Sequence, residues 1–542
     1  MSESKMTPEA VLNRQARDQA LQAMHGIGVE PTSLVNYQSR GRVAVIGDQL
    51  ALEIAPRLNG RLSPVVVLTQ GAEEPGSPVV PLGGRSLRIE GYLGAFKIHL
   101  GEAGRANAET LAVDLILDLS QRPLMTRGMN PPGYYHSDIE EDRLSSVIDE
   151  MAQMTGNFEK PRYFDYDPAI CAHGRSGKTA CTRCIDACPA DAITGLAESV
   201  EVNSYLCQGG GACASVCPSG AIRYVYPSLR DSLHRLRKLL HTYREQGGRS
   251  PVVVFHAASD EPLTDEMPTH YLPVMVEELA SIGMDAWLTA LAYGARQVLL
   301  ADGGNMPSSV TDAMQEQLTI TQQILDALGY PQASIRLIAH TQLLQDAGEG
   351  MPEIEAAGYS GIGGKRQSIY LAIDHLFGQA ERSKPMASLP AGAPFGTVYV
   401  EDKACTLCFS CVGACPGKAL QSGSEGMPQL RFIEANCLQC GLCTRTCPED
   451  AIWITPRLLF DAESRSRKRT LREEEPFHCT SCGKPFATRS VIEKMRGRLK
   501  DHYMFQSERA LKRLTLCDAC RVVDIVQDSE AMGGELDGRL RQ

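Results

Sequence analysis

The residues best suited to chemistry in this sequence are its nineteen cysteines, which fall into three groups. Seven lie between Cys171 and Cys217, eight between Cys405 and Cys447, and four between Cys479 and Cys520. The N-terminal residues show neither a secretory nor a twin-arginine signal, so we expect a cytoplasmic protein. Because thiols are kept reduced in the cytoplasm, grouped cysteines indicate metal binding rather than disulfides.

The second group contains one ligand pattern twice. The run C-x2-C-x2-C-x3-C-P begins at residue 405 and again at residue 437. In two-cluster bacterial ferredoxins, the fourth cysteine of each run binds the cluster of the other run. Two zinc knuckles would explain neither the proline nor the duplication. We therefore expect one [4Fe-4S] cluster on Cys405, Cys408, Cys411 and Cys447, and a second on Cys437, Cys440, Cys443 and Cys415.

The first group departs from this pattern in both halves. In the first half, the expected first ligand position holds Lys178, and Cys171 can supply the missing thiolate if residues 172–180 loop outward. In the second half, Gly210 stands where the central cysteine belongs. The crossing rule assigns one [4Fe-4S] cluster to Cys171, Cys181, Cys184 and Cys217, and leaves Cys188, Cys207 and Cys213 for the other site.

A site with three thiolates can hold a three-iron cluster, or a four-iron cube whose fourth iron binds water or another oxygen. We predict a [3Fe-4S] cluster on Cys188, Cys207 and Cys213, with an open-site [4Fe-4S] cluster as the first alternative. The other alternative is that this cluster has been lost, which would leave three idle buried thiols.

The third group pairs two C-x2-C knuckles that are separated by 34 residues. Four thiolates on two such knuckles are typical of a structural zinc site. A rubredoxin-type iron would use the same ligands, but few aromatic residues lie nearby to shield it. We therefore predict zinc on Cys479, Cys482, Cys517 and Cys520, with iron as the alternative.

Around the cysteines, the sequence alternates between strand-like and helix-like segments. Runs such as RVAVIG (42–47) and PVVVF (251–255) are typical of buried strands, and helix-like stretches follow them. The six-residue pattern C-P-x-x-A-[I/L] begins at residues 188, 217, 415 and 447, which favours two ferredoxin modules, each with an internal repeat. The expected fold class is a multidomain chain of α/β and α+β parts.

These segments predict the following regions in chain order. They are an N-terminal helical segment (1–40), an α/β domain (41–128), a linker (129–165), ferredoxin module 1 (166–228), a second α/β domain (229–345), a helix and linker (346–396), ferredoxin module 2 (397–458) and a zinc-ribbon-like module (459–542). The basic run at 465–472 reads as a solvated connector, with contact to an acidic partner as the alternative.

Composition argues against several classes of function. The net charge of −11 disfavours a nucleic-acid surface. No stretch reaches the roughly 18 apolar residues of a membrane span. Gly177, Lys178 and Thr179 resemble the end of a phosphate-binding loop, but Ala172 replaces the glycine required five residues earlier.

Several segments resemble a family of multi-cluster ferredoxin-type proteins encoded beside bacterial molybdenum- or tungsten-dependent formate dehydrogenases. They are NPPGY (130–134), EKPRY (159–163), CAHGRSGKTACTRCIDAC (171–188), EELASIGMDAWLTALAYG (277–294) and FHCTSCGKPF (477–486). The resemblance implies formate dehydrogenase subunits as redox partners. The second α/β domain is also similar to the delta subunit of methyl viologen-reducing hydrogenase, although it lacks the cysteines that hold that subunit's cluster.

These observations favour a protein that relays electrons to or from a formate dehydrogenase, since cysteine-held clusters pass single electrons with little rearrangement. The sequence offers no hydride site and no nucleophile–base pair, so we expect no bond chemistry from this chain alone. Two alternatives stay open. The chain could be an accessory factor that matures a molybdenum enzyme, or an iron–sulfur enzyme whose substrate binds an open iron near Gly210.

Overall fold

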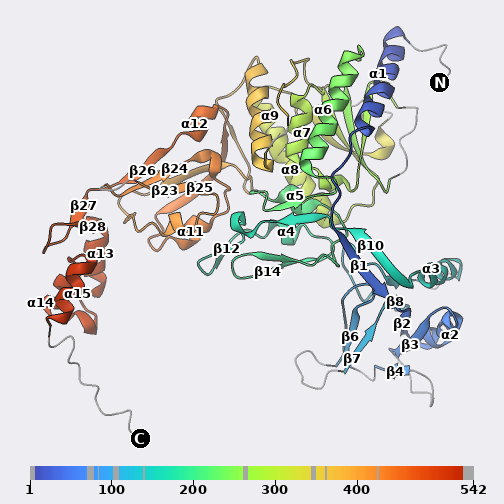
Figure 1. Cartoon of the computed structure of the whole chain (residues 1–542), viewed down its shortest axis with the longest axis horizontal. Coiled ribbons are helices and arrows are strands. Elements are labelled where there is room, and N and C mark those ends of the chain that lie inside the picture. Colours follow the sequence, from blue (N-terminus) through green and yellow to red (C-terminus); the bar gives the residue numbers. More distant parts are fainter. Residues whose placement is uncertain are drawn as a thin grey trace, which may run out of the picture. The chain divides into compact units, whose positions relative to one another are not determined.

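The computed structural model describes residues 7–69, 79–82, 85–101, 109–137, 141–260, 267–343, 349–360, 363–423 and 427–528. The chain divides into two compact units, one of residues 1–168 and 182–383 and the other of residues 169–181 and 384–542 (Figure 1). Within the described ranges, no helix is both long enough and apolar enough to cross a membrane.

The first α/β domain is built on a parallel sheet with the strand order β4-β3-β2-β8-β9. These strands are β2 (Arg42–Gly47), β3 (Ser63–Leu68), β4 (Val79–Pro81), β8 (Leu115–Asp118) and β9 (Tyr134–His136). Both faces of β2 are buried, because Val43 and Val45 enter one hydrophobic cluster and Ala44 and Ile46 enter another. Helix α2 (Gln49–Leu58) packs on the first face, and an antiparallel sheet of β5 (Leu87–Glu90), β6 (Phe96–Leu100) and β7 (Glu109–Val113) covers the second.

Residues 129–165, which the sequence predicts as a linker, contain regular structure. They hold β9, α3 (Glu141–Gln153) and β10 (Gly156–Pro161), and β10 pairs with β1 (Leu34–Ser39). Strand β9 extends the parallel sheet beside β8. Its three residues follow the turn-rich sequence NPPG, and three residues are too few to show a strand period. This segment is thus part of the first domain.

The second α/β domain contains a parallel sheet with the order β18-β17-β19-β20. Its strands are β17 (Val252–Ala257), β18 (Tyr271–Val276), β19 (Gln297–Asp302) and β20 (Ile335–Ala339), and its helices are α6 (Leu229–Glu245), α7 (Met284–Ala292), α8 (Ser308–Leu328) and α9 (Lys365–Gln379). Every residue of β17 and of α7 is buried, which explains their continuous apolar sequences. The N-terminal helix α1 (Pro8–His25) packs against α6 (Figure 1).

Ferredoxin module 1 is small and consists of two strand pairs and two short helices. Strand β11 (Phe164–Tyr166) pairs with β16 (Ile222–Tyr224), and β14 (Ile193–Gly195) pairs with β15 (Val200–Val202). The helices α4 (Arg183–Asp186) and α5 (Ala212–Val216) each carry or adjoin cysteines. All of these elements belong to the first unit.

Ferredoxin module 2, in the second unit, repeats this arrangement. Its pairs are β22 (Gly396–Val400) with β25 (Ile452–Leu459) and β23 (Leu420–Ser422) with β24 (Gln429–Phe432), and its helices are α10 (Ser410–Gly413) and α11 (Leu442–Thr446). Strand β21 (Met386–Ser388) extends the first sheet and β26 (Arg469–Glu473) extends the second. A hairpin from the loop between Cys171 and Cys181, β12 (Gly174–Arg175) and β13 (Lys178–Thr179), belongs to the same unit and contacts α11.

The chain ends in a small module of one hairpin and three helices. These are β27 (Pro476–His478), β28 (Pro485–Thr488), α13 (Arg489–Leu499), α14 (Glu508–Arg513) and α15 (Asp518–Val526). The basic run before it is not a solvated connector, because α12 (Ala462–Ser466) and β26 occupy most of it. The buried Arg465 donates to the carbonyl oxygen of Leu459 at 2.8 Å, and Arg469 pairs with the buried Glu434 at 3.3 Å. These partners lie outside the run, so its charge pattern could not reveal them.

Candidate iron–sulfur and metal sites

Module 2 contains two cavities, and each is lined by four cysteines. Cys405, Cys408, Cys411 and Cys447 line the first, together with Val400, Leu407 and Ile452. Cys415, Cys437, Cys440 and Cys443 line the second, together with Val398, Phe432 and Ile454. Each cavity thus takes three cysteines from one run and one from the other, which is the grouping that the crossing rule predicts. Four soft sulfur donors in an apolar surround fit an iron–sulfur cluster.

The loops between these cysteines have a recurring backbone conformation. Leu407 and Phe409 have φ values of +54° and +58°, and Gln439 and Gly441 have φ values of +52° and +80°. One residue in each C-x2-C gap is therefore left-handed, a conformation that is uncommon for residues other than glycine. The repeated left-handed residues wind each run tightly, so that three successive cysteines reach the same cavity.

Burial keeps these thiols protonated until a metal replaces the proton. Burial and the neighbouring thiols raise the pKa of Cys411 to about 12. For Cys440, burial and neighbours that include Cys181 raise the pKa to about 12 as well. Since thiolates are the form that binds iron, cluster binding must release these protons.

A hydrogen bond to the cysteine sulfur explains the alanine in the repeated C-P-x-x-A pattern. In three of the four copies the backbone N–H of the alanine donates to the cysteine sulfur, from Ala192 to Cys188 (3.4 Å), Ala419 to Cys415 (3.2 Å) and Ala451 to Cys447 (3.4 Å). In the fourth copy, the N–H of Ala221 donates to the Ser219 hydroxyl instead. Hydrogen bonds to cluster sulfurs are one of the features that set reduction potentials.

Module 1 brings together the three cysteines of the incomplete site. Cys188, Cys207 and Cys213 all pack against the hydrophobic cluster of the module. Burial, together with the thiols of Cys207 and Cys188, raises the pKa of Cys213 well above its ordinary value. The three side chains are therefore neighbours in an apolar surround, and they fit a cluster that has three protein thiolates.

The loop around Gly210 keeps the conformation of a cluster-binding loop. Gly209 and Gly211 have φ values of +82° and +73°, so they repeat the left-handed pair that flanks Cys440. Gly210 itself is not left-handed. The backbone is thus set up for a central ligand, and only the cysteine side chain is missing.

The sequence assigns the other site of module 1 to Cys171, Cys181, Cys184 and Cys217, which the structure divides between the two units. Cys184 and Cys217 belong to the first unit, whereas Cys171 and Cys181 belong to the second. Within the second unit, Arg445 of α11 donates to the carbonyl oxygen of Thr179 at 2.6 Å. The hairpin β12–β13, which precedes Cys181, is thereby fixed beside the helix that carries Cys443. The assignment of these four cysteines to one cluster stays a prediction from the sequence.

Two partly buried lysines that cysteine spacing could not reveal lie beside module 1. The Lys160 ammonium donates to the carbonyl oxygens of Tyr205 and Cys207. Lys365, at the start of α9, donates to the carbonyl oxygen of Ala214 at 2.8 Å and to that of Ser215. Both therefore place positive charge next to cysteine-bearing segments, where it favours the more negative, reduced state of a cluster.

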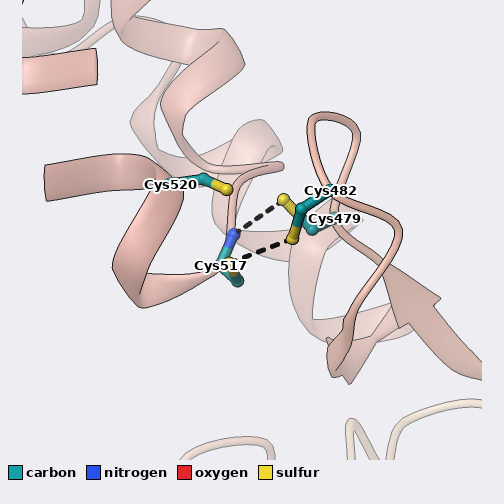
Figure 2. Close-up of side chains that lie close together, drawn as sticks. All are labelled: Cys479, Cys482, Cys517 and Cys520. Carbon is teal, nitrogen blue, oxygen red and sulfur yellow. Dashed lines mark hydrogen bonds between the residues drawn. The ribbon is translucent and has the colours of Figure 1, made fainter. Parts of the chain in front are cut away.

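The C-terminal module gathers the four remaining cysteines (Figure 2). The sulfurs of Cys479, Cys482, Cys517 and Cys520 all lie within 4.8 Å of one another. The first two come from the turn after β27, and the others lie at the start of α15. Burial opposes ionisation of the Cys479 thiol, but backbone N–H groups, among them that of Cys517 at 3.3 Å, outweigh it and lower its pKa to about 6. Four thiolates at this separation can close a tetrahedral metal site.

All nineteen cysteines lie in the described part of the chain, and all are free thiols. Comparison with known protein families matches two of the regions that they occupy. Residues 404–451 match a 4Fe-4S dicluster domain, and residues 200–223 match a 4Fe-4S binding domain. The chain contains ferredoxin-type 4Fe-4S domains.

Similarity to individual curated proteins is confined to a short segment. Over 45 residues the chain is 40% identical to the ferredoxin-type protein NapF of Escherichia coli K12, and the NapF proteins of strains O6:H1 and O157:H7 give the same values. The segment is 8% of this chain and covers 27% of NapF, so the chain spans only about a quarter of the length of these relatives. Together the matches support an iron–sulfur, ferredoxin-like electron-transfer protein.

Proposed function

We propose that this chain is a cytoplasmic electron relay that carries electrons to or from a formate dehydrogenase. We assign [4Fe-4S] clusters to the two cavities of module 2 and to Cys171, Cys181, Cys184 and Cys217. The fourth site, on Cys188, Cys207 and Cys213, would hold a three-iron or an open four-iron cluster. We assign zinc, as a structural ion, to Cys479, Cys482, Cys517 and Cys520. When bound, the clusters accept and release single electrons, and the protein supplies thiolates, burial and hydrogen bonds.

The observation that carries this proposal is that cysteines assigned to different sites lie close to one another within each unit. In module 2, burial and neighbouring thiols, including Cys411 of the other cavity, raise the pKa of Cys443, so the two cavities adjoin. In the same unit, Cys181 is close enough to Cys440 to raise its pKa. In module 1, Cys184 and Cys217 act on Cys213 in the same way. Within each unit, cysteines assigned to different sites therefore lie close to one another, as electron transfer between clusters requires.

The formate dehydrogenase partner rests on the family resemblance of the segments between the cysteines. Affinity purification of the chain from its native host, with metal analysis of the complex, tests it directly. We expect stoichiometric formate dehydrogenase subunits, and reduction of the clusters when formate is added. Only transient binding to the immature enzyme, with no reduction by formate, would favour the accessory-factor alternative instead.

A further inference from the structure

The incomplete site of module 1 lies next to a sulfur that the cysteine pattern does not include. A β-carbon built on Gly210 would have the Met129 sulfur as its nearest heavy atom, at 3.5 Å, followed by two ring carbons of Pro189 at 3.6 and 4.0 Å. Of these three atoms only the sulfur can bind a metal. It lies within van der Waals distance of the position that the β-carbon of the missing cysteine would occupy.

The chain holds Met129 in this place through contacts with the segment that follows Cys188. The Met129 N–H donates to the carbonyl oxygen of Pro189 at 2.8 Å. Two residues earlier, Arg127 pairs with Asp191 at 3.5 Å. Met129 also directly precedes the NPPGY segment that leads into β9, so a sheet strand anchors its other side. The methionine is therefore positioned by contacts on both sides rather than lying on a free loop.

We propose that the Met129 thioether is the fourth protein ligand of the cluster held by Cys188, Cys207 and Cys213. This inference rests on the proposed cluster at that site. Thioethers are soft donors that suit iron–sulfur centres, but they are neutral and bind iron more weakly than thiolates. The fourth iron would therefore be exchangeable, lost on oxidation to leave a three-iron cluster and regained on reduction.

A cavity of about 210 Å³ lies beside Gly210 and Met129. Gly210 and Met129 line it, and so do the carboxylates of Asp260, Glu278 and Asp302 from the second α/β domain. Anions such as formate are disfavoured among these carboxylates, whereas Fe²⁺ is attracted. The cavity therefore fits a path for iron better than a site for an anionic substrate.

The exchange can be written with its electrons balanced. An oxidised [3Fe-4S]⁺ cluster takes one electron from a reductant such as dithionite, and the reduced cluster then binds one Fe²⁺ to give [4Fe-4S]²⁺. The incoming iron would bind three cluster sulfides and the Met129 sulfur. Oxidation reverses the step and releases the iron.

The test uses the full-length protein, oxidised in air and then treated anaerobically with dithionite and ⁵⁷Fe²⁺. The variants are Met129→Leu, which conserves volume but removes the sulfur, and Met306→Leu, which removes a sulfur from the same cavity away from Gly210. We expect wild type and Met306→Leu to bind one labelled iron and lose the three-iron resonance. Met129→Leu should bind that iron at least tenfold more weakly.

A rescue variant separates loss of a ligand from damage to the fold. Gly210→Cys has room for its β-carbon and requires no left-handed backbone, so we expect it to supply the usual thiolate. The double variant Met129→Leu/Gly210→Cys should keep four irons at this site even in air. Equal iron affinity in wild type and Met129→Leu would overturn the methionine assignment while leaving the relay intact. If no cluster depends on Cys188, both the methionine assignment and the proposed cluster at this site would be overturned.

Discussion

At the scale of single residues, the crossing of the cysteine runs is the property that a pair of substitutions can test. The Cys411 and Cys447 side chains line the same cavity although they come from different runs. Cys411→Ser and Cys447→Ser should therefore damage the same cluster, because each removes one thiolate from it. Magnetic resonance of the reduced protein can identify which cluster signal is lost.

Cys415→Ser serves as the matched control for that pair. It lies four residues after Cys411 in the same run, but it lines the other cavity. Cys415→Ser should abolish the signal of the cluster in that other cavity and leave the signal of the cluster held by Cys411 and Cys447 unchanged. If Cys411→Ser and Cys447→Ser affected different clusters, the assignment by cavity would be wrong.

The ion pair at Glu434 is a second residue-scale feature with a measurable consequence. Glu434 is only 5% exposed, accepts two hydrogen bonds from Arg457 at 2.8 and 2.9 Å, and lies three residues before Cys437. Glu434→Gln would leave the partly buried Arg457 and Arg469 without their carboxylate partner, so we expect a loss of about 3 kcal/mol in the stability of module 2. Denaturant titration of the visible cluster absorbance measures this loss.

An exposed carboxylate provides the comparison for Glu434. Glu463 lies on the surface of α12, and Glu463→Gln should change the stability by no more than about 0.5 kcal/mol. Similar small effects for both substitutions would mean that the Glu434 pair contributes little to holding the loop that carries Cys437.

At the scale of elements, we expect the C-terminal module to depend on a metal, because its two knuckles come from separate segments. The Thr480 and Thr515 hydroxyls, 2.9 Å apart, also join these segments, but the module has few buried apolar residues of its own. We predict one zinc per chain. Cys482→Ser should remove it and expose the C-terminal module to limited proteolysis, because the metal supplies folding energy.

The same Cys482→Ser variant should keep its visible cluster absorbance, since none of the cluster cysteines is altered. Ser481→Ala, at the neighbouring position, is the control that should leave the zinc content unchanged. An extra iron in place of zinc, with a rubredoxin-like spectrum, would contradict this prediction.

The sequence predicts local features of these elements well and long-range features poorly. The spacing of the cysteines is a local pattern that extends over a few residues. The cysteines that line each cavity of module 2 could therefore be predicted from the sequence. Helix α12 and strand β26 could not be predicted, because Arg465 of α12 and Arg469 of β26 find their partners outside the charged run. The approach of Met129 to Gly210 joins two different domains, and no periodic pattern marks it.

At the scale of the whole molecule, the insertion between Cys171 and Cys181 places part of the module 1 sequence in the second compact unit, with module 2. It replaces the usual two-residue gap with the hairpin β12–β13, which belongs to the second compact unit. With the usual C-x2-C spacing, the chain would lack the hairpin that contacts α11. In the proposed relay, we predict that electrons pass between the modules by way of this insertion.

Arg445→Ala tests this connection. Its guanidinium holds the carbonyl oxygen of Thr179 at 2.6 Å, so its loss should let Cys181 move away from Cys440. We expect electron transfer between the modules to slow several-fold, because it depends steeply on distance, while the iron content stays unchanged. Rapid mixing with a reductant, followed by freezing and magnetic resonance, resolves the filling of each cluster. Arg467→Ala, on the exposed part of the basic run, should transfer electrons at the wild-type rate. An unchanged rate in Arg445→Ala would mean that the modules exchange electrons by another route or serve separate partners.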